Sequence, residues 1–161
     1  FFIDIGSREV RCGGIAHNPD SNWTSQIARN MCDMWDGFLL GKRYLIHDRD
    51  PVFNKHFDMI FESIGIEIKN LPPLTPMMNS RMENFIRAIK TECLDKIIFT
   101  NEYQLRFAVK EYLEYWNHYR PHAGLNGNMV LPYPQNAGEE IQEIPFLGGL
   151  LHGYRRIRQA A

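Results

Sequence analysis

The feature that most constrains the fold of this 161-residue chain is the alternation of short β-prone runs with amphipathic helical patterns. Two β-prone runs, 1–5 and about 9–16, are separated by the turn-forming residues 6–8 and predict a hairpin. Further strands are predicted at 43–47 and 66–69. Strands that alternate with helices are typical of the α/β class, so we expect a single α/β domain.

Four helices are predicted from apolar residues that recur every three or four positions. Asn18–Ser21 offers an N-cap region for the first helix, and Asp50-Pro51 leads into the second, which Gly65 ends in a left-handed C-cap. Arg120-Pro121 ends the fourth helix, and Ile144–Leu151 indicates a closing hairpin. The apolar residues that form the four patterns are Trp23, Ile27, Met31, Met34 and Trp35; Phe53, Phe57, Ile60, Phe61 and Ile64; Met82, Phe85, Ile86, Ile89 and Cys93; and Leu105, Ala108, Val109, Tyr112, Leu113 and Trp116, the last set facing inward.

Composition narrows the classes of partner. Hydrophobic residues make up 44% of the chain and charged residues 23%, which is typical of a globular protein. The formal net charge is −1, so the field of the whole molecule does not favour nucleic acid, and any such surface must be local. No apolar run approaches the roughly 18 residues that a membrane span requires. The scattered Cys12, Cys32 and Cys93 are predicted to be reduced thiols of a cytoplasmic protein.

Two carboxylates are the main candidates for chemistry. Asp48 directly follows the strand predicted at 43–47, and Glu83 lies 35 positions later (83 − 48), near the start of a helix. The carboxyl ends of strands collect ligands, and a helix N-terminus favours an ionised carboxylate. Because Mg²⁺ prefers hard oxygen ligands, the pair predicts a magnesium site. Arg87 and Lys90 follow Glu83 at i+4 and i+7, where they could steer a phosphodiester backbone.

A purely structural interpretation of these residues also stands. An Asp after a strand is often a turn former, and a Glu near a helix start is often only a favourable end charge. Glu83 and Arg87 could simply form an i, i+4 pair worth roughly 0.2–0.5 kcal/mol. His47 and His56 have no companions at metal-binding spacing and are predicted to be structural or surface residues.

Four segments add a more specific signal: His47–Phe53, Pro72-Pro73, Asn79–Asn84 and Tyr115–Leu125. Together they resemble the catalytic core of retroviral-type integrases and bacterial insertion-sequence transposases of the DDE type. The resemblance extends from residue 1 to about 125, and residues 126–161 are treated as a C-terminal extension. It implies a ribonuclease H-like mixed sheet flanked by helices, with three carboxylates that hold two Mg²⁺ or Mn²⁺ ions. Such enzymes join a DNA 3′-hydroxyl to a target phosphodiester.

By position, Asp48 matches the second catalytic carboxylate of that family and Glu83 the third. Asp50 competes for the middle role, but its spacing to Glu83 is shorter and Asp50-Pro51 better suits a cap. The first carboxylate lies on the family's opening strand, which we expect to be missing from this chain because Ile3–Arg8 resembles the second strand. Asp4 is an alternative ligand, although a turn cap or a partner for Arg8 is its expected role. The chain is therefore expected to be inactive in strand transfer by itself.

The resemblance also implies DNA as the partner and a homo-oligomer as the assembly, with no membrane and no small-molecule substrate. Arg87 and Lys90, together with His118, Arg120 and His122 near the end of the fourth helix, are the candidates for contact with DNA or a partner. Basic and acidic residues are mixed over 79–120, so DNA binding is expected to be weak and salt-sensitive. Two alternatives remain open: a non-catalytic remnant of a mobile element that binds DNA or a partner, and a metal-dependent nuclease on the same fold.

Overall fold

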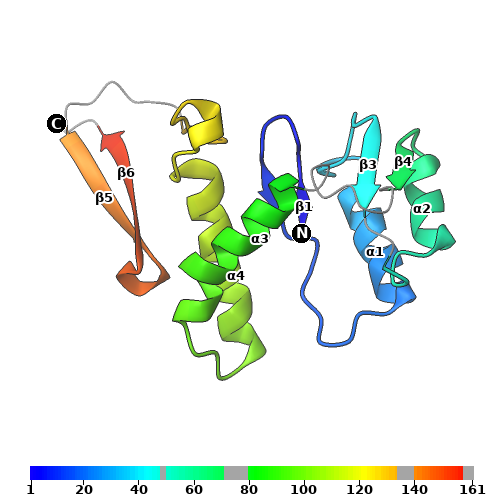
Figure 1. Ribbon diagram of the computed structural model, residues 1–161, viewed down its shortest axis with the longest axis horizontal. Coiled ribbons are helices and arrows are strands. Elements are labelled where there is room, and N and C mark those ends of the chain that lie inside the picture. Colours follow the sequence, from blue (N-terminus) through cyan, green and yellow to red (C-terminus); the bar gives the residue numbers. More distant parts are fainter. Residues whose placement is uncertain (48–49, 71–79, 134–139, 158–161) are drawn as a thin grey trace. The chain divides into compact units, whose positions relative to one another are not determined.

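The computed structural model describes residues 1–47, 50–70, 80–133 and 140–157, and its elements are labelled in Figure 1. The chain divides into two compact units. Unit 1 consists of Phe1–Phe2 and Arg11–Ser80, and unit 2 consists of Ile3–Val10 and Arg81–Ala161. Each unit is described below by itself.

The predicted alternation of strands and helices is confirmed, and the class is mixed α/β. The described strands form three separate two-stranded sheets, β1–β2, β3–β4 and β5–β6. No helix among the described residues is long and apolar enough to cross a bilayer. The helices and strands are β1 Phe2–Ile3, β2 Val10–Arg11, α1 Ser21–Met31, β3 Tyr44–His47, α2 Lys55–Glu62, β4 Glu67–Asn70, α3 Ser80–Glu92, α4 Glu102–His118, β5 Glu140–Phe146 and β6 Leu151–Ile157.

Unit 1 contains a parallel strand pair with a helix between its strands. β3 and β4 pair in parallel, with Tyr44 opposite Glu67 and His47 opposite Asn70. Parallel strands need a crossover connection, and α2 lies within that connection. The strands predicted at 43–47 and 66–69 are therefore confirmed, the second displaced by one residue. The described part of β3 ends at His47, and Asp48 is the next residue in the sequence.

Short polar side chains set the starts of three helices. Asp20 Oδ1 accepts the Trp23 N–H at 2.7 Å, and Asn54 Oδ1 accepts the N–H groups of His56 and Phe57. At the start of α4, the Asn101 side chain accepts the Gln104 N–H. These bonds satisfy backbone donors that a helix start otherwise leaves without a partner. The predicted lead-in of α2 at Asp50-Pro51 was wrong by one turn, because Asn54 provides the cap.

Met34 and Trp35 were predicted to lie at helical spacing in the first helix, and this prediction was wrong. The helix ends at Met31, and the two side chains are 81% and 92% exposed. Asp33 Oδ1 accepts the Trp35 N–H in a tight turn, and the Leu39 N–H donates to the Met31 carbonyl. The chain thus folds back on the helix end and buries Leu39 instead.

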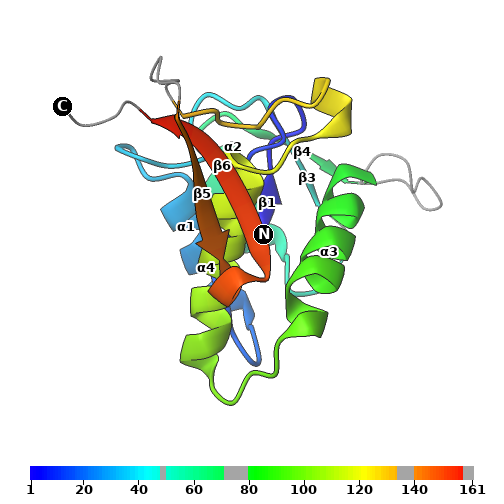
Figure 2. The same cartoon turned by 90° about the vertical axis from the view of Figure 1, so that its left-hand side faces the viewer.

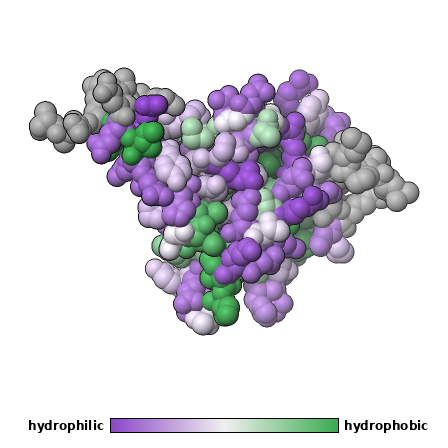
Figure 3. All heavy atoms as spheres, turned by 60° about the vertical axis from the view of Figure 1, so that its left-hand side comes forward, coloured by the Kyte–Doolittle hydropathy of each residue, from purple (hydrophilic) through white to green (hydrophobic). Residues whose placement is uncertain are grey.

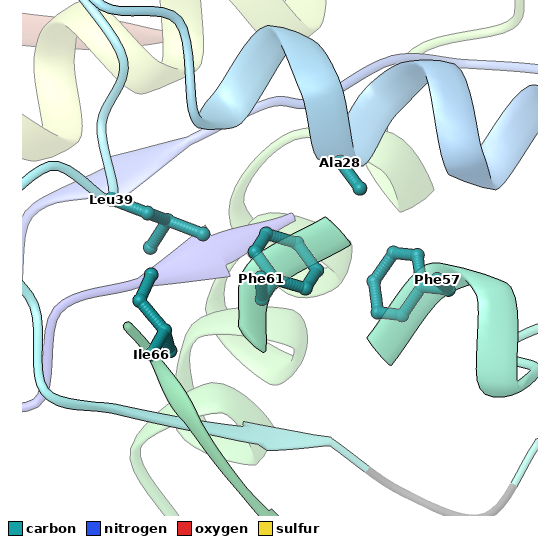
Figure 4. Packing of buried hydrophobic residues seen from close by; sticks show 5 residues of the cluster. All are labelled: Ala28, Leu39, Phe57, Phe61 and Ile66. Atoms are coloured by element: carbon teal, nitrogen blue, oxygen red, sulfur yellow. The ribbon is translucent and has the colours of Figure 1, made fainter. Parts of the chain in front are cut away.

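Aromatic side chains of α2 dominate the core of unit 1. Phe57 and Phe61 are buried with their ring centroids 4.9 Å apart in an edge-to-face arrangement. Figure 4 shows them packed with Ala28 of α1, Leu39 of the following loop and Ile66 next to β4. After α2, Gly65 has a φ of +84°, which confirms the predicted left-handed C-cap.

Unit 2 is built around α3 and α4. Phe85 of α3 packs edge-to-face on Trp116 of α4, with ring centroids 5.0 Å apart. The antiparallel hairpin β5–β6 lies in front of α4 in the view of Figure 2. Phe146 of β5 packs on Tyr119, the residue that follows α4, with ring centroids 5.0 Å apart. This hairpin occupies the region in which the sequence indicates one.

The short strands β1 and β2 form the predicted N-terminal hairpin, which is shorter than expected. Within unit 2, Asp4 Oδ1 accepts the Ser7 N–H at 2.6 Å and caps the turn between them. Val10 is anchored to α4, because Asn117 Oδ1 accepts its N–H at 3.0 Å and Asn117 Nδ2 donates to its carbonyl at 2.9 Å. The Asn117 side chain therefore satisfies both backbone hydrogen-bonding groups of Val10, which is fully buried.

Candidate metal and nucleic-acid site

Glu83 lies in the first turn of α3, as predicted, and its side chain is exposed. The Glu83 carboxylate forms no hydrogen bond or ion pair with any other residue that the structure describes. An exposed carboxylate has the hard oxygens that a divalent cation needs, and the ligand role of Glu83 stays a prediction.

Asp48 lies outside the described residues, and it falls in unit 1 whereas Glu83 falls in unit 2. The residue before it is firmly held. His47 Nε2 lies 2.9 Å from Asp58 Oδ1 of α2, and the His47 ring packs against Phe53 and Phe57 at centroid distances of 5.3 and 5.7 Å. The strand end that precedes Asp48 is therefore attached to α2.

The two competing carboxylates have backbone partners. Asp50 Oδ1 accepts the Val52 N–H at 2.9 Å, and Asp4 caps its turn through Ser7. These bonds are those of turn formers. Within the described ranges, no three His, Cys, Asp or Glu side chains lie together in a way that could hold a metal ion.

Arg87 and Lys90 are exposed on α3, and Phe85 and Ile89 of the same helix are buried. Successive helix residues are rotated by about 100°, so the two cations share with Glu83 a face opposite to the apolar one. Most of the face drawn in Figure 3 is hydrophilic, with apolar side chains in a central band and a few smaller patches. The outer face of α3 can thus present one carboxylate and two cations to a phosphodiester.

His118 and Arg120 are only partly exposed, unlike the exposed cations of α3. His118 Nδ1 lies 2.8 Å from the Leu131 carbonyl, and its ring stacks on Tyr133 with centroids 4.6 Å apart. Arg120 lies over the Trp116 ring, 4.9 Å from the centroid. Both side chains therefore have intramolecular roles in unit 2.

Glu92 is a residue that the sequence analysis missed. Its carboxylate accepts two hydrogen bonds from the Arg120 guanidinium, at 2.7 and 3.2 Å, and one from the Tyr112 hydroxyl at 2.8 Å. Glu92 follows Ile89 by three positions and Phe85 by seven, which puts it on the apolar side of α3. A charged residue at such a position needs a partner, and this was the available signal.

Electrostatics in this cluster favours the ion pair. Burial alone disfavours the Arg120 cation, but the hydrogen bonds and charge of Glu92 outweigh it and raise the pKa of Arg120. Burial, together with the hydrogen bond to Glu92, raises the pKa of the Tyr112 hydroxyl well above its ordinary range. Tyr112 therefore stays a neutral donor, and Arg120 stays charged.

His122, a further contact candidate, is only 4% exposed. Its Nε2–H donates to the Trp116 carbonyl at 3.0 Å, and its ring lies edge-on to the Trp116 ring at 4.6 Å. Burial lowers the pKa of His122 from its ordinary value of 6.5. The side chain is therefore neutral at pH 7 and acts as a core residue of unit 2.

This lowered pKa predicts acid sensitivity. The unfolded chain takes up the His122 proton at a higher pH than the folded chain, so the free energy of unfolding falls as the pH drops below 6.5. A single group contributes at most about 1.4 kcal/mol per pH unit. Urea unfolding at pH 7 and pH 5 measures the loss, which we expect to be smaller in His122→Gln. An equal loss in both proteins would contradict the prediction.

Comparison with known proteins assigns part of the chain. Residues 64–129 match the family model described as an integrase core domain. This segment is similar to an integrase core domain. The match includes Glu83, Arg87, Lys90 and Arg120, and it begins after Asp48. No curated protein and no solved structure matches the chain.

Proposed function

We propose that this chain serves DNA integration or transposition, as a DDE-type strand-transferase core with a ribonuclease H-like fold. The observation that carries the proposal is Glu83 in the first turn of α3, inside the segment that matches an integrase core domain. Its carboxylate is exposed and has no internal partner among the residues that the structure describes. The position of Asp48, directly after the end of β3, supports the second ligand.

In this proposal Asp48 and Glu83 hold Mg²⁺ or Mn²⁺ through carboxylate oxygens. A bound ion neutralises charge on the phosphodiester, which is the main requirement of phosphoryl transfer. Arg87 and Lys90 share the outer face of α3 with Glu83 and contact DNA phosphates beside it. We assign these contacts to them rather than to His118 and Arg120, whose side chains are bound within unit 2.

Two carboxylates support one ion, whereas joining DNA ends requires two ions about 3.5–4 Å apart. We therefore propose that the 161-residue chain binds one ion and does not carry out strand transfer by itself. We also propose that the active assembly is a homo-oligomer on DNA. Because its substrate is DNA, we propose that the protein acts in the compartment that contains DNA, which for a bacterial mobile element is the cytosol.

Metal binding tests the ligands directly. We expect Asp48→Asn and Glu83→Gln each to weaken Mn²⁺ binding at least about tenfold, equal to about 1.4 kcal/mol, because each change removes one anionic ligand. Isothermal titration calorimetry or the electron paramagnetic resonance signal of free Mn²⁺ measures the affinity. Glu62→Gln, which removes an exposed carboxylate from the end of α2, is the matched control and keeps wild-type affinity. Wild-type affinity in Asp48→Asn and Glu83→Gln would refute the assignment.

Incubation with Mn²⁺ and labelled DNA separates the alternatives. We expect no joined products from the chain alone, and a nuclease would release shorter fragments without joining ends. Robust strand transfer that Asp48→Asn abolishes would overturn the proposed inactivity and leave the family chemistry intact. Binding of DNA without any response to Asp48→Asn or Glu83→Gln would favour the non-catalytic remnant.

A further inference from the structure

The inner face of α3 is attached to α4 by two kinds of contact. Phe85 packs on the rings of Trp116 and Tyr112, with centroids 5.0 and 6.4 Å apart. Glu92, near the other end of α3, receives the hydrogen bonds of Arg120 and Tyr112. Both partners of the ion pair are about one quarter exposed, at 27% for Arg120 and 28% for Glu92, so solvent screens the pair only in part.

These two kinds of contact constrain α3 differently. Apolar packing is non-directional and leaves a helix free to turn or slide by small amounts. A guanidinium that grips both oxygens of a carboxylate has a fixed planar geometry, and the Tyr112 hydroxyl adds a third direction. Arg120 is itself held over the Trp116 ring. The cluster of Glu92, Arg120 and Tyr112, here called the α3 clamp, therefore fixes the rotation and the axial position of α3.

The clamp and the cations lie on opposite sides of the same helix. At about 100° per residue, Arg87 and Lys90 lie opposite Glu92, and one residue of slippage along the helix would turn both cations away by about the same angle. A helix of this length moves as a rigid body, because its backbone hydrogen bonds couple all its turns. A constraint on the inner face thus decides what the outer face presents.

We propose that the α3 clamp is a positioning device for DNA binding: Glu92, with Arg120 and Tyr112, orients α3 so that Arg87 and Lys90 meet the phosphate backbone. Arg120 then acts on DNA through α3 and makes no phosphate contact of its own. This inference rests on the proposed function, in that it takes Arg87 and Lys90 as the phosphate contacts.

The variant Glu92→Gln separates a positioning role from a direct contact by the sign of its effect. If Arg120 contacted phosphate, loss of the Glu92 charge would free the guanidinium and tighten DNA binding. If the clamp positions α3, the same change weakens binding, by about 3- to 10-fold for a coupled pair of this kind. The affinity of the full chain for a labelled duplex, measured by fluorescence anisotropy at several salt concentrations, gives the answer.

Two further variants sharpen the comparison. Arg120→Lys keeps the positive charge but loses the bidentate geometry, so it weakens binding as much as Arg120→Gln if the clamp positions α3. A direct phosphate contact would tolerate lysine. Glu102→Gln is the matched control, since it removes an exposed carboxylate of α4 that pairs with Arg106 four positions along the same helix. It leaves binding unchanged or slightly tighter.

Coupling to the cations distinguishes positioning from general damage to the fold. In the Arg87→Gln, Lys90→Gln background, Glu92→Gln has no further effect on DNA affinity, because the contacts it would misplace are already gone. A general loss of structure would weaken binding in this background too. Near-UV circular dichroism checks the fold, and Tyr112→Phe, which keeps the ring and removes one hydrogen bond, replaces Glu92→Gln if that variant does not fold.

Each result has one meaning. The clamp is supported if Glu92→Gln and Arg120→Lys weaken DNA binding and if Glu92→Gln has no further effect in the Arg87→Gln, Lys90→Gln background. Tighter binding by Glu92→Gln, or wild-type binding by Arg120→Lys, overturns the clamp alone. Each lost phosphate contact lowers the slope of the salt dependence by about 0.9. If the Arg87→Gln, Lys90→Gln protein keeps wild-type DNA affinity and salt dependence, the assignment of the phosphate contacts is wrong, and so is the clamp inference.

Discussion

Phe61→Ala lowers the free energy of unfolding of unit 1 by about 3–5 kcal/mol. Phe61 is fully buried, and its ring lies edge-to-face on Phe57, 4.9 Å between centroids, at the centre of the cluster in Figure 4. Truncation removes the transfer free energy of the ring and leaves a cavity that α1 and β4 cannot close without moving. Urea unfolding combined with hydrogen exchange of the α1 and α2 amides measures the loss in the affected unit.

Met59→Ala is the control for this change, because Met59 is on the same helix and 61% exposed. Its effect on the free energy of unfolding should stay within about 0.5 kcal/mol. If Phe61→Ala were as mild as Met59→Ala, the described core of unit 1 would be wrong. Protection of the α3 and α4 amides reports whether the loss remains within unit 1.

Asn117→Ala lowers the free energy of unfolding of unit 2 by about 2–4 kcal/mol. Asn117 is 7% exposed and bonds both backbone groups of Val10, which is 0% exposed. Alanine leaves a buried N–H and a buried carbonyl without partners, and each such group costs about 1–3 kcal/mol. Denaturant unfolding followed by the fluorescence of Trp116, the neighbour of Asn117 in α4, measures the effect, with Trp23 and Trp35 replaced by phenylalanine in all proteins compared.

Asn117→Asp separates the two bonds, because a carboxylate still accepts the Val10 N–H but cannot donate to its carbonyl. This variant should fall between wild type and Asn117→Ala. Asn84→Ala, an exposed position on α3, provides the baseline with a change of at most about 0.5 kcal/mol. Equal stability of Asn117→Ala and Asn84→Ala would contradict the role given to Asn117.

The stability and the proposed function of unit 2 depend on neighbouring parts of one helix. Tyr112 and Trp116 of α4 contact α3, and Asn117 anchors the N-terminal hairpin to the same helix. α4 is therefore the scaffold on which the exposed face of α3 is held. Variants of α4 should be assayed for both stability and DNA binding, since only the clamp residues are expected to change binding more than their effect on stability explains.

Much of the secondary structure followed from the sequence, because helices and turns depend on residues a few positions apart. Periodicity placed α2, α3 and α4 to within a few residues, and Gly65 ended α2 as expected. Periodicity misled at Met34 and Trp35, where an Asp33 turn interrupts the helix although the apolar spacing continues. Local polar side chains decided that case against the pattern.

The sequence by itself determined the order of strands and helices, the acidic first turn of α3 that carries Glu83, and the opposition of its apolar and charged faces. Only the tertiary structure showed that Arg120 donates hydrogen bonds to Glu92, 28 positions away, and that Asn117 bonds the backbone of Val10, 107 positions away. The reason is physical. A helical or turn preference is set by neighbours along the chain, whereas the partner of a buried charge or amide is whichever group the packed elements bring within hydrogen-bonding distance.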